Sequence, residues 1–241
     1  MKLITTTSNE EAGILAADIF SEAINAEPDI VLGLATGSTP LPLYRCLVRK
    51  YTEGSIDFSK VRTVNLDENV GLPGTHAQSY RYFMDNNLFN HINIDPANTH
   101  LPNGTAADME GECERYDAVI DKLRGIGLQL LGIGHNGHVG FNEPSDIFSA
   151  RTQIVKLTES TINANSRFFS NSSEMPKLAI TMGIRDIMLA RKIVMIAGAE
   201  KKDILEKALY GDITPLVPAS VLQLHRDVTV ILSSEARNTE D

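Results

Sequence analysis

Cysteine and tryptophan are nearly absent from this sequence, which has two cysteines and no tryptophan in 241 residues. Cys46 and Cys113 lie in segments patterned as helices, and no metal-type spacing links them, so we expect two reduced thiols with no role in chemistry. Long apolar runs are also missing. None approaches the roughly 20 residues that cross a bilayer, and the N-terminus has no signal-peptide core. We therefore expect a cytoplasmic protein with no membrane partner.

Runs of lysine and arginine are lacking as well, and the formal net charge is -9. This balance excludes the basic surface of a nucleic-acid binder. An anionic small molecule would need a local group of cations in so acidic a protein. Hydrophobic residues make up 42% and charged residues 22%, which is ordinary for a soluble globular fold.

Helix and strand patterns alternate along the chain. Ser8 and Glu11 form a capping box ahead of a helical pattern that runs to about Ala26. The apolar run 30–34 then ends in a Gly-containing turn, with Pro40 in the first turn of the helix that follows. Further strands are predicted near residues 61–66, 128–133, 154–157, 178–181, 193–197 and 228–232.

This alternation predicts an α/β fold with a doubly wound, mainly parallel sheet and helices on both faces, a Rossmann-like arrangement. No repeat, low-complexity tract or linker divides the chain, so residues 1–241 are predicted to form one domain. Ligands of such folds bind outside the carboxyl ends of the strands. The polar turns that directly follow strands are therefore the candidate sites.

The first such turn contains Thr36, Gly37, Ser38 and Thr39. Its hydroxyls and backbone N–H groups, together with the positive end of a helix dipole, suit a phosphate. The alternative is that a hydroxyl only caps the helix while the glycine permits the turn. The turn lacks the lysine of a nucleotide-binding loop and the GxGxxG spacing, so a monophosphate is favoured over a nucleotide.

The second turn brings a strand directly into Asp67 and Glu68. Carboxylates at the mouth of a buried strand are partly desolvated, which raises their basicity and suits a general base. An ordinary solvated turn is the alternative.

The third turn, residues 132–144, is the most informative. Four glycines surround Asn136, His138, Asn142 and Glu143. A histidine and a carboxylate on one such loop can form an acid/base relay, in which the carboxylate orients the imidazole. Two alternatives remain, a metal site built from His135, His138 and Glu143, and a purely structural glycine-rich turn. The HxxH spacing is not that of a zinc-binding helix, and the glycines oppose a helix here.

The segments LATGSTP, NLDE, GHNGHVGFNEP and SRFF, in this order, closely resemble the glucosamine-6-phosphate deaminase family. The resemblance extends over essentially the whole length and includes PASVLQLH at 218–225. It implies isomerisation of glucosamine 6-phosphate coupled to deamination in amino-sugar catabolism, with no metal and no organic cofactor. We also expect the enzyme to be classed as a hydrolase. We expect it to be a monomer or a small homo-oligomer.

The resemblance also implies roles for individual residues. Asp67 matches the proton acceptor for enolisation, and His138 matches the ring-opening acid/base, supported by Glu143 and Asn136. Arg167 and Lys201 match phosphate-binding cations, although Lys202 is adjacent and a shift of one position stays open. The remaining substrate-binding or phosphate-binding positions are Thr36, Gly37, Ser38, Thr39, Glu68 and Gly137.

Two departures from the family pattern matter. Many members carry Asp where this chain has Asn136, which changes the charge near His138 and the expected pH dependence. The chain also ends soon after the predicted strand at 228–232, whereas allosteric relatives are longer, so we expect no cooperative activation by N-acetylglucosamine 6-phosphate. The alternative functions are a 6-phosphogluconolactonase-type hydrolase, which needs no C2 base, and a non-enzymatic sugar-phosphate sensor.

Overall fold

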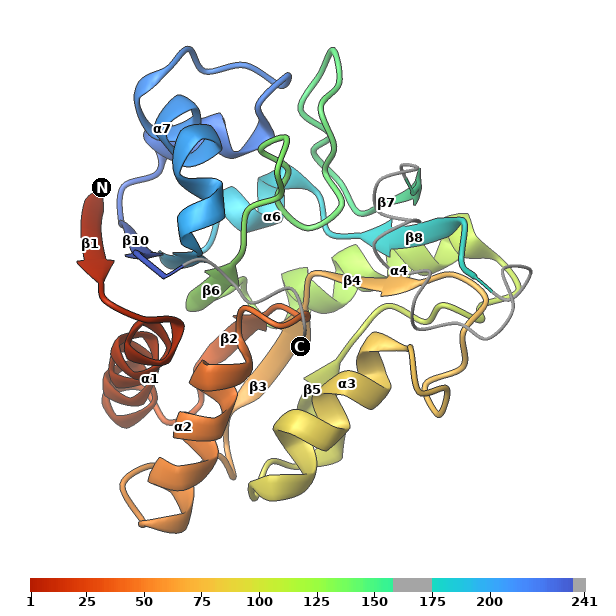
Figure 1. The fold of residues 1–241 in the computed structure, drawn as a ribbon. Coiled ribbons are helices and arrows are strands. Elements are labelled where there is room, and N and C mark those ends of the chain that lie inside the picture. Colours follow the sequence, from red (N-terminus) through yellow and green to blue (C-terminus); the bar gives the residue numbers. More distant parts are fainter. Residues whose placement is uncertain (158–174, 236–241) are drawn as a thin grey trace.

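The computed structural model describes residues 1–157 and 175–235. Its centre is a seven-stranded sheet in the order β1-β10-β9-β6-β2-β3-β5, and every neighbouring pair is parallel (Figure 1). The strands are β1 (Lys2–Thr6), β2 (Val31–Leu34), β3 (Arg62–Asn65), β5 (Thr99–His100), β6 (Leu128–Leu131), β9 (Lys192–Ala197) and β10 (Val228–Ser233). The predicted doubly wound α/β fold is confirmed.

Helices cover both faces of this sheet (Figure 1). Right-handed crossovers put α1 (Asn9–Ala26), α2 (Leu41–Thr52) and α3 (Tyr80–Asn87) on one face, because their connections run in one direction along the strand order. The connections through α4 (Met109–Lys122), α6 (Ile184–Met188) and α7 (Lys202–Tyr210) run in the other direction and cover the opposite face. Short 3-10 helices are η1 (Phe89–His91), η2 (Pro96–Asn98), η4 (Ala199–Lys201) and η5 (Pro218–Leu224).

A second, antiparallel sheet joins β4 (Asp67–Asn69), β8 (Leu178–Thr181) and β7 (Gln153–Lys156). The expectation that the strands near 154–157 and 178–181 belong to the parallel sheet is therefore wrong. The chain leaves the main sheet after β3, and Asp67 pairs with Thr181 instead. An apolar strand pattern predicts that a strand is buried, but it does not predict which sheet the strand joins.

The N-terminal boundaries follow local chemistry. Ser8 caps α1 by accepting from the Glu11 backbone N, while the Glu11 carboxylate accepts from the Thr7 backbone N at 2.6 Å. Pro40 is the N-cap of α2 rather than its first residue. The edge strands β1 and β5 are not among the predicted strands. β5 has only two residues, and β1 is mostly exposed, so neither shows the continuous apolar run of a buried strand.

A close helix contact holds α1 against α2. At Gly13 the backbone approaches so closely that an added Cβ would lie 2.4 Å from Pro42 Cβ. Leu43 and Phe20 are fully buried in the same core. Because α2 begins directly after the turn 36–39, this contact also fixes the position of that turn. Within the described ranges, no helix is long and apolar enough to cross a membrane.

We predict that Gly13→Ala destabilises the protein, although alanine favours helices. The added methyl group would also lie 2.8 Å from the Leu43 backbone N, so the two helices must separate. The free energy of unfolding, measured by urea denaturation, should fall by about 1–3 kcal/mol. Glu22→Ala, at an exposed position of the same helix, is the control and should change it by less than about 0.5 kcal/mol. Equal stability of Gly13→Ala and the parent would show that this contact is not tight.

Candidate active site

Four polar segments meet at the carboxyl ends of adjacent strands. They follow β2, β3, β6 and β9, which are neighbours in the order β9-β6-β2-β3. The connections leaving β2 and β6 turn to opposite faces, so a crevice opens between these strands. A cavity of about 400 Å³ occupies this place. Its lining includes Thr36, Thr39, Asp67, Tyr80, Asn136, His138, Phe141 and Lys201.

The turn after β2 lies at one side of the cavity. Thr36 and Thr39 line it, whereas Gly37 and Ser38 are exposed and are not among the lining residues. Gly37 has φ 95°, a conformation that suits glycine. No side chain caps the N-terminus of α2, so the hydroxyls of the turn are not used as helix caps. The capping interpretation is therefore not what the structure shows.

Asp67 is the first residue of β4, and its side chain is nearly buried at the cavity wall. Burial and, second, the neighbouring Glu68 raise the pKa of the Asp67 carboxyl to about 8. Within residues 1–157 and 175–235, no protein group donates a hydrogen bond to this carboxyl. A raised pKa and unused lone pairs are what a proton acceptor requires.

Glu68 points the other way, because consecutive strand residues project to opposite faces. Its carboxylate accepts from the backbone N of Asn69 and of Tyr80, both at 2.8 Å, and of Arg81 at 2.9 Å. Burial nevertheless keeps the pKa of Glu68 raised, since its effect outweighs these bonds. Glu68 borders a different cavity, of about 320 Å³. Contrary to expectation, the structure does not bring Glu68 into the cavity with Asp67.

The loop after β6 carries the imidazole. His138 Nδ1 lies 3.0 Å from Glu143 Oε1, although the N–H direction is not that of a well-formed hydrogen bond. Such contacts often tighten when substrate binds. Asn136 Nδ2 donates to Glu143 Oε2 at 2.5 Å, and Asn136 Oδ1 accepts from the His138 backbone N at 3.2 Å. Asn136 therefore bridges the carboxylate and the backbone of His138.

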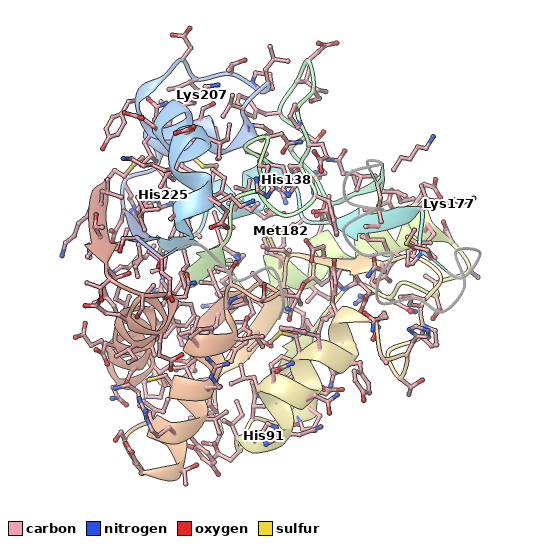
Figure 2. The ribbon with its side chains drawn as sticks, in the orientation of Figure 1. His91, His138, Lys177, Met182, Lys207 and His225 are labelled. Atoms are coloured by element: carbon pink, nitrogen blue, oxygen red, sulfur yellow. The ribbon has the colours of Figure 1, made fainter. Side chains whose placement is uncertain are left out.

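Glu143 lies behind the imidazole rather than in the cavity, and it borders a neighbouring space of about 160 Å³. Burial opposes ionisation of Glu143, but the contacts with His138 and Asn136 together outweigh it and hold its pKa below the ordinary value. An ionised Glu143 can orient His138 and stabilise its protonated form. Figure 2 shows His138 near the middle of the molecule, far from His91.

Glycine fixes the path of this loop. A Cβ on Gly134 would lie 2.3 Å from the His138 ring, so only glycine leaves room for the imidazole. Gly137 has φ 87°, is buried, and its carbonyl accepts from the Ala219 backbone N at 2.8 Å. Gly137 is not among the lining residues of the cavity, so the structure gives it a role in the loop backbone.

The structure describes the two candidate lysines of the phosphate site but not the arginine. Lys201, in η4 after β9, is buried and lines the cavity, whereas Lys202 is exposed and is not among the lining residues. The geometry thus favours Lys201 at this site. Arg167 lies outside the described residues.

Tyr80 and Phe141 were not identified from sequence. Both line the cavity, and their rings stack with centroids 6.3 Å apart and an interplanar angle of 12°. Tyr80 opens helix α3 rather than following a strand, so the search of post-strand turns passes over it. In the described part of the chain, no group of three or more His, Cys, Asp or Glu is arranged to hold a metal ion.

Comparison with known proteins places this geometry in a family. Residues 8–231 match the family model described as glucosamine-6-phosphate isomerases/6-phosphogluconolactonase. The glucosamine-6-phosphate deaminase of Lachnoclostridium phytofermentans is 59% identical, covering 98% of this chain and 100% of that one. The enzyme of the same name from a Thermoanaerobacter species is 53% identical, covering 98% and 94%.

Two solved structures are informative. One described as a monomeric glucosamine-6-phosphate deaminase superposes with a TM-score of 0.94 at 44% identity, covering 98% of each chain. The 6-phosphogluconolactonase of Trypanosoma cruzi superposes with a TM-score of 0.75 at 19% identity, covering 97% of this chain and 94% of that one, a likeness of fold alone.

These findings correct one expectation and establish another. The class of hydrolase is wrong, because the full-length relatives at 53–59% identity are named deaminases. The resemblance stated from the sequence is confirmed, since the family model covers nearly the whole chain. The chain belongs to the glucosamine-6-phosphate isomerase/6-phosphogluconolactonase family.

Proposed function

We propose that this protein is a glucosamine-6-phosphate deaminase, which converts glucosamine 6-phosphate and water into fructose 6-phosphate and ammonia. The observation that carries the proposal is the pairing of two groups on one cavity. Asp67, a carboxyl with a raised pKa and no protein donor in the described residues, lines the same cavity as His138, an imidazole beside Glu143. Isomerising an amino sugar requires both a base and a ring-opening acid/base. The relatives named as glucosamine-6-phosphate deaminases support this function.

The first task is to open the sugar ring. One proton must leave the C1 hydroxyl and one must reach the ring oxygen as the C1–O bond breaks, which an imidazole can perform in turn as base and acid. His138 has this role. Glu143 stabilises the imidazolium that forms in between, and Asn136 fixes the Glu143 carboxylate.

The second task is to move a proton from C2 to C1. Asp67 removes the C2 proton of the open-chain aldehyde, and the electron pair passes through an enolamine toward the C1 oxygen. Return of the proton to C1 leaves an imine at C2. Water adds to that imine, and ammonia leaves as the C2–N bond breaks, giving the ketone. A carboxyl with a pKa near 8 is basic enough to take a carbon-bound proton more readily than an exposed carboxylate.

The phosphate is assigned to the turn Thr36–Thr39 and to Lys201, with Arg167 completing the set of cations. Thr36, Thr39 and Lys201 border the cavity together, and the N-terminus of α2 adds its dipole. Fixing this remote group orients the reacting carbons, so phosphate binding supports the rate as well as affinity.

We further propose that residues 1–241 act as one catalytic domain in the cytoplasm, as a monomer or small homo-oligomer, on a small-molecule substrate and without nucleic acid. A lactonase would need no base at C2, so a buried Asp67 carboxyl with a raised pKa on the cavity wall favours the deaminase. The test is to incubate purified protein with glucosamine 6-phosphate and measure ammonia and fructose 6-phosphate together. Equal amounts of both are expected. Release of neither, with activity on 6-phosphogluconolactone, would refute the proposal.

We predict that Asp67→Asn keeps substrate affinity but lowers kcat by about 10²–10⁴-fold, because the amide preserves shape and removes the base. Exchange of the C2 hydrogen with deuterated water should fall in parallel. Asp203→Asn, at an exposed position of α7, is the control and should leave both rates unchanged. Near-normal C2 exchange in Asp67→Asn would show that another group takes the proton.

We predict that kcat/KM of the parent rises with pH up to about pH 8. The base must be ionised, and its pKa is raised to about 8. The same shift affects stability. A carboxyl with a raised folded-state pKa binds its proton in the folded protein where the unfolded chain has lost it, so stability falls as pH rises from about 4 to 8.

Asp67→Asn removes this effect. Its free energy of unfolding should exceed that of the parent by roughly 1–3 kcal/mol at pH 8, and by much less at pH 4. Urea denaturation at the two pH values measures the difference. A gap that is the same at both pH values would mean that Asp67 titrates as an ordinary carboxyl.

We predict that Asn136→Asp moves the pH dependence of kcat/KM to higher pH. The substitution adds negative charge beside His138, and it removes the amide that now donates a hydrogen bond to Glu143 Oε2. Both changes favour the protonated imidazole. Asp67 chemistry should be largely preserved, as measured by C2 exchange. A profile that is unchanged, or shifted to lower pH, would show that position 136 does not act on His138 through charge.

A further inference from the structure

We propose that Asn142 is a positioning residue, which together with Thr181 fastens the loop of His138 to the segment that carries Asp67. The inference rests on the proposed function, because it concerns the geometry of the same reaction. Asn142 is one of the polar residues of the loop after β6, but neither ring opening nor proton transfer uses it. It is 5% exposed and borders the space of about 160 Å³ beside Glu143 rather than the substrate cavity.

The side-chain amide of Asn142 joins two segments. Asn142 Nδ2 donates to the Val139 carbonyl of its own loop at 3.0 Å and to the Met182 carbonyl, directly after β8, at 2.9 Å. Asn142 Oδ1 accepts from Gln153 Nε2, in β7, at 3.3 Å. An amide nitrogen carries two N–H groups, and both are used here. Asn142 thus holds the turn next to His138 against the small antiparallel sheet.

Met182 extends this connection to the proposed base. Its carbonyl accepts from Asn142, while its backbone N donates to the Leu66 carbonyl at 2.7 Å. Leu66 directly precedes Asp67 in the chain. Met182 and His138 both lie near the middle of the molecule (Figure 2). Two successive hydrogen bonds therefore connect the imidazole loop to the residue before Asp67.

A second bond runs beside the first. The backbone N of Phe141 donates to Thr181 Oγ1 at 3.1 Å, and Thr181 pairs with Asp67 across the small sheet. The preceding residue, Gly140, lines the cavity. A Cβ added there would lie 3.0 Å from Thr181 Oγ1 and 3.6 Å from Asp67 Oδ2. The loop therefore lies against the Asp67 carboxyl, and a shift of the loop would change the surroundings of both reacting groups.

Burial makes the bonds from Asn142 important for the position of the loop. Val139 and Met182 are buried, so a lost donor leaves their carbonyls without a partner and favours displacement of the loop. His138 must act at C1 and the ring oxygen while Asp67 acts at C2 of the same substrate. A misplacement of about 1 Å can lower a rate by about 10²-fold. The turn 36–39 follows a different strand, so loss of the amide should affect kcat more than affinity.

The first test removes the amide. Asn142→Ala should lower kcat for glucosamine 6-phosphate about 10-fold or more and lower C2 exchange in parallel, with the Kd for fructose 6-phosphate within about 3-fold of the parent. Gln223→Ala is the matched control, because Gln223 Nε2 also donates to two carbonyls, of Ala208 at 2.9 Å and Gly211 at 3.0 Å. None of these three residues lines the cavity.

Both alanine variants should have a lower Tm, but only Asn142→Ala should lose kcat, measured well below either Tm. An unchanged kcat in Asn142→Ala would overturn the proposal. A loss confined to affinity, or an equal loss of kcat in Gln223→Ala, would overturn it as well.

Thr181→Val tests the second bond, because it removes the acceptor of the Phe141 N–H and keeps the size of the side chain. The proposal requires kcat to fall by roughly 3-fold or more at saturating substrate, with the Kd for fructose 6-phosphate retained. A normal kcat in Thr181→Val would overturn the proposal, and this variant alone would decide if Asn142→Ala failed to fold. A parent protein that releases no ammonia would instead refute the proposed function, which separates the two failures.

Discussion

The change in direction of the chain between β2 and β6 is the constraint on which the site depends. The connection that leaves β2 covers one face of the sheet and the connection that leaves β6 covers the other, so a crevice opens at the strand ends between them. The turn after β2 and the loop after β6 therefore face each other across an open crevice. The turn proposed to bind phosphate and the His138 imidazole become neighbours although they lie about 100 residues apart in the sequence.

Burying two adjacent carboxyls beside that crevice costs free energy, and the structure compensates only one of them with hydrogen bonds from the described residues. Glu68 receives three backbone donors and secures the start of α3. Asp67 receives none from the described protein and keeps a raised pKa. The same alternation of strand side chains thus yields one structural carboxylate and one that is available to a substrate, and the second destabilises the fold at neutral pH.

The imidazole has a different environment. Glu143 places a charged acceptor beside the His138 ring, and the neutral Asn136 side chain links Glu143 to the His138 backbone. Asn136 satisfies both the carboxylate and the loop backbone, which an aspartate could not do, because it lacks a donor. Asn136 therefore fixes the geometry of the loop, but the His138 ring has one negative charge fewer nearby than it would have with an aspartate at this position.

The sequence alone determined the local features of this protein. Capping at Ser8, the apolar strands and the glycines of the loop 132–144 all depend on neighbours within a few residues. Tertiary structure decided the rest. It placed β7 and β8 in a separate antiparallel sheet, turned Glu68 away from the cavity, favoured Lys201 over Lys202, and stacked Tyr80, at the start of a helix, on Phe141 of the loop after β6. Side-chain direction and strand partner depend on contacts across long stretches of chain, and no local pattern of residues encodes those contacts.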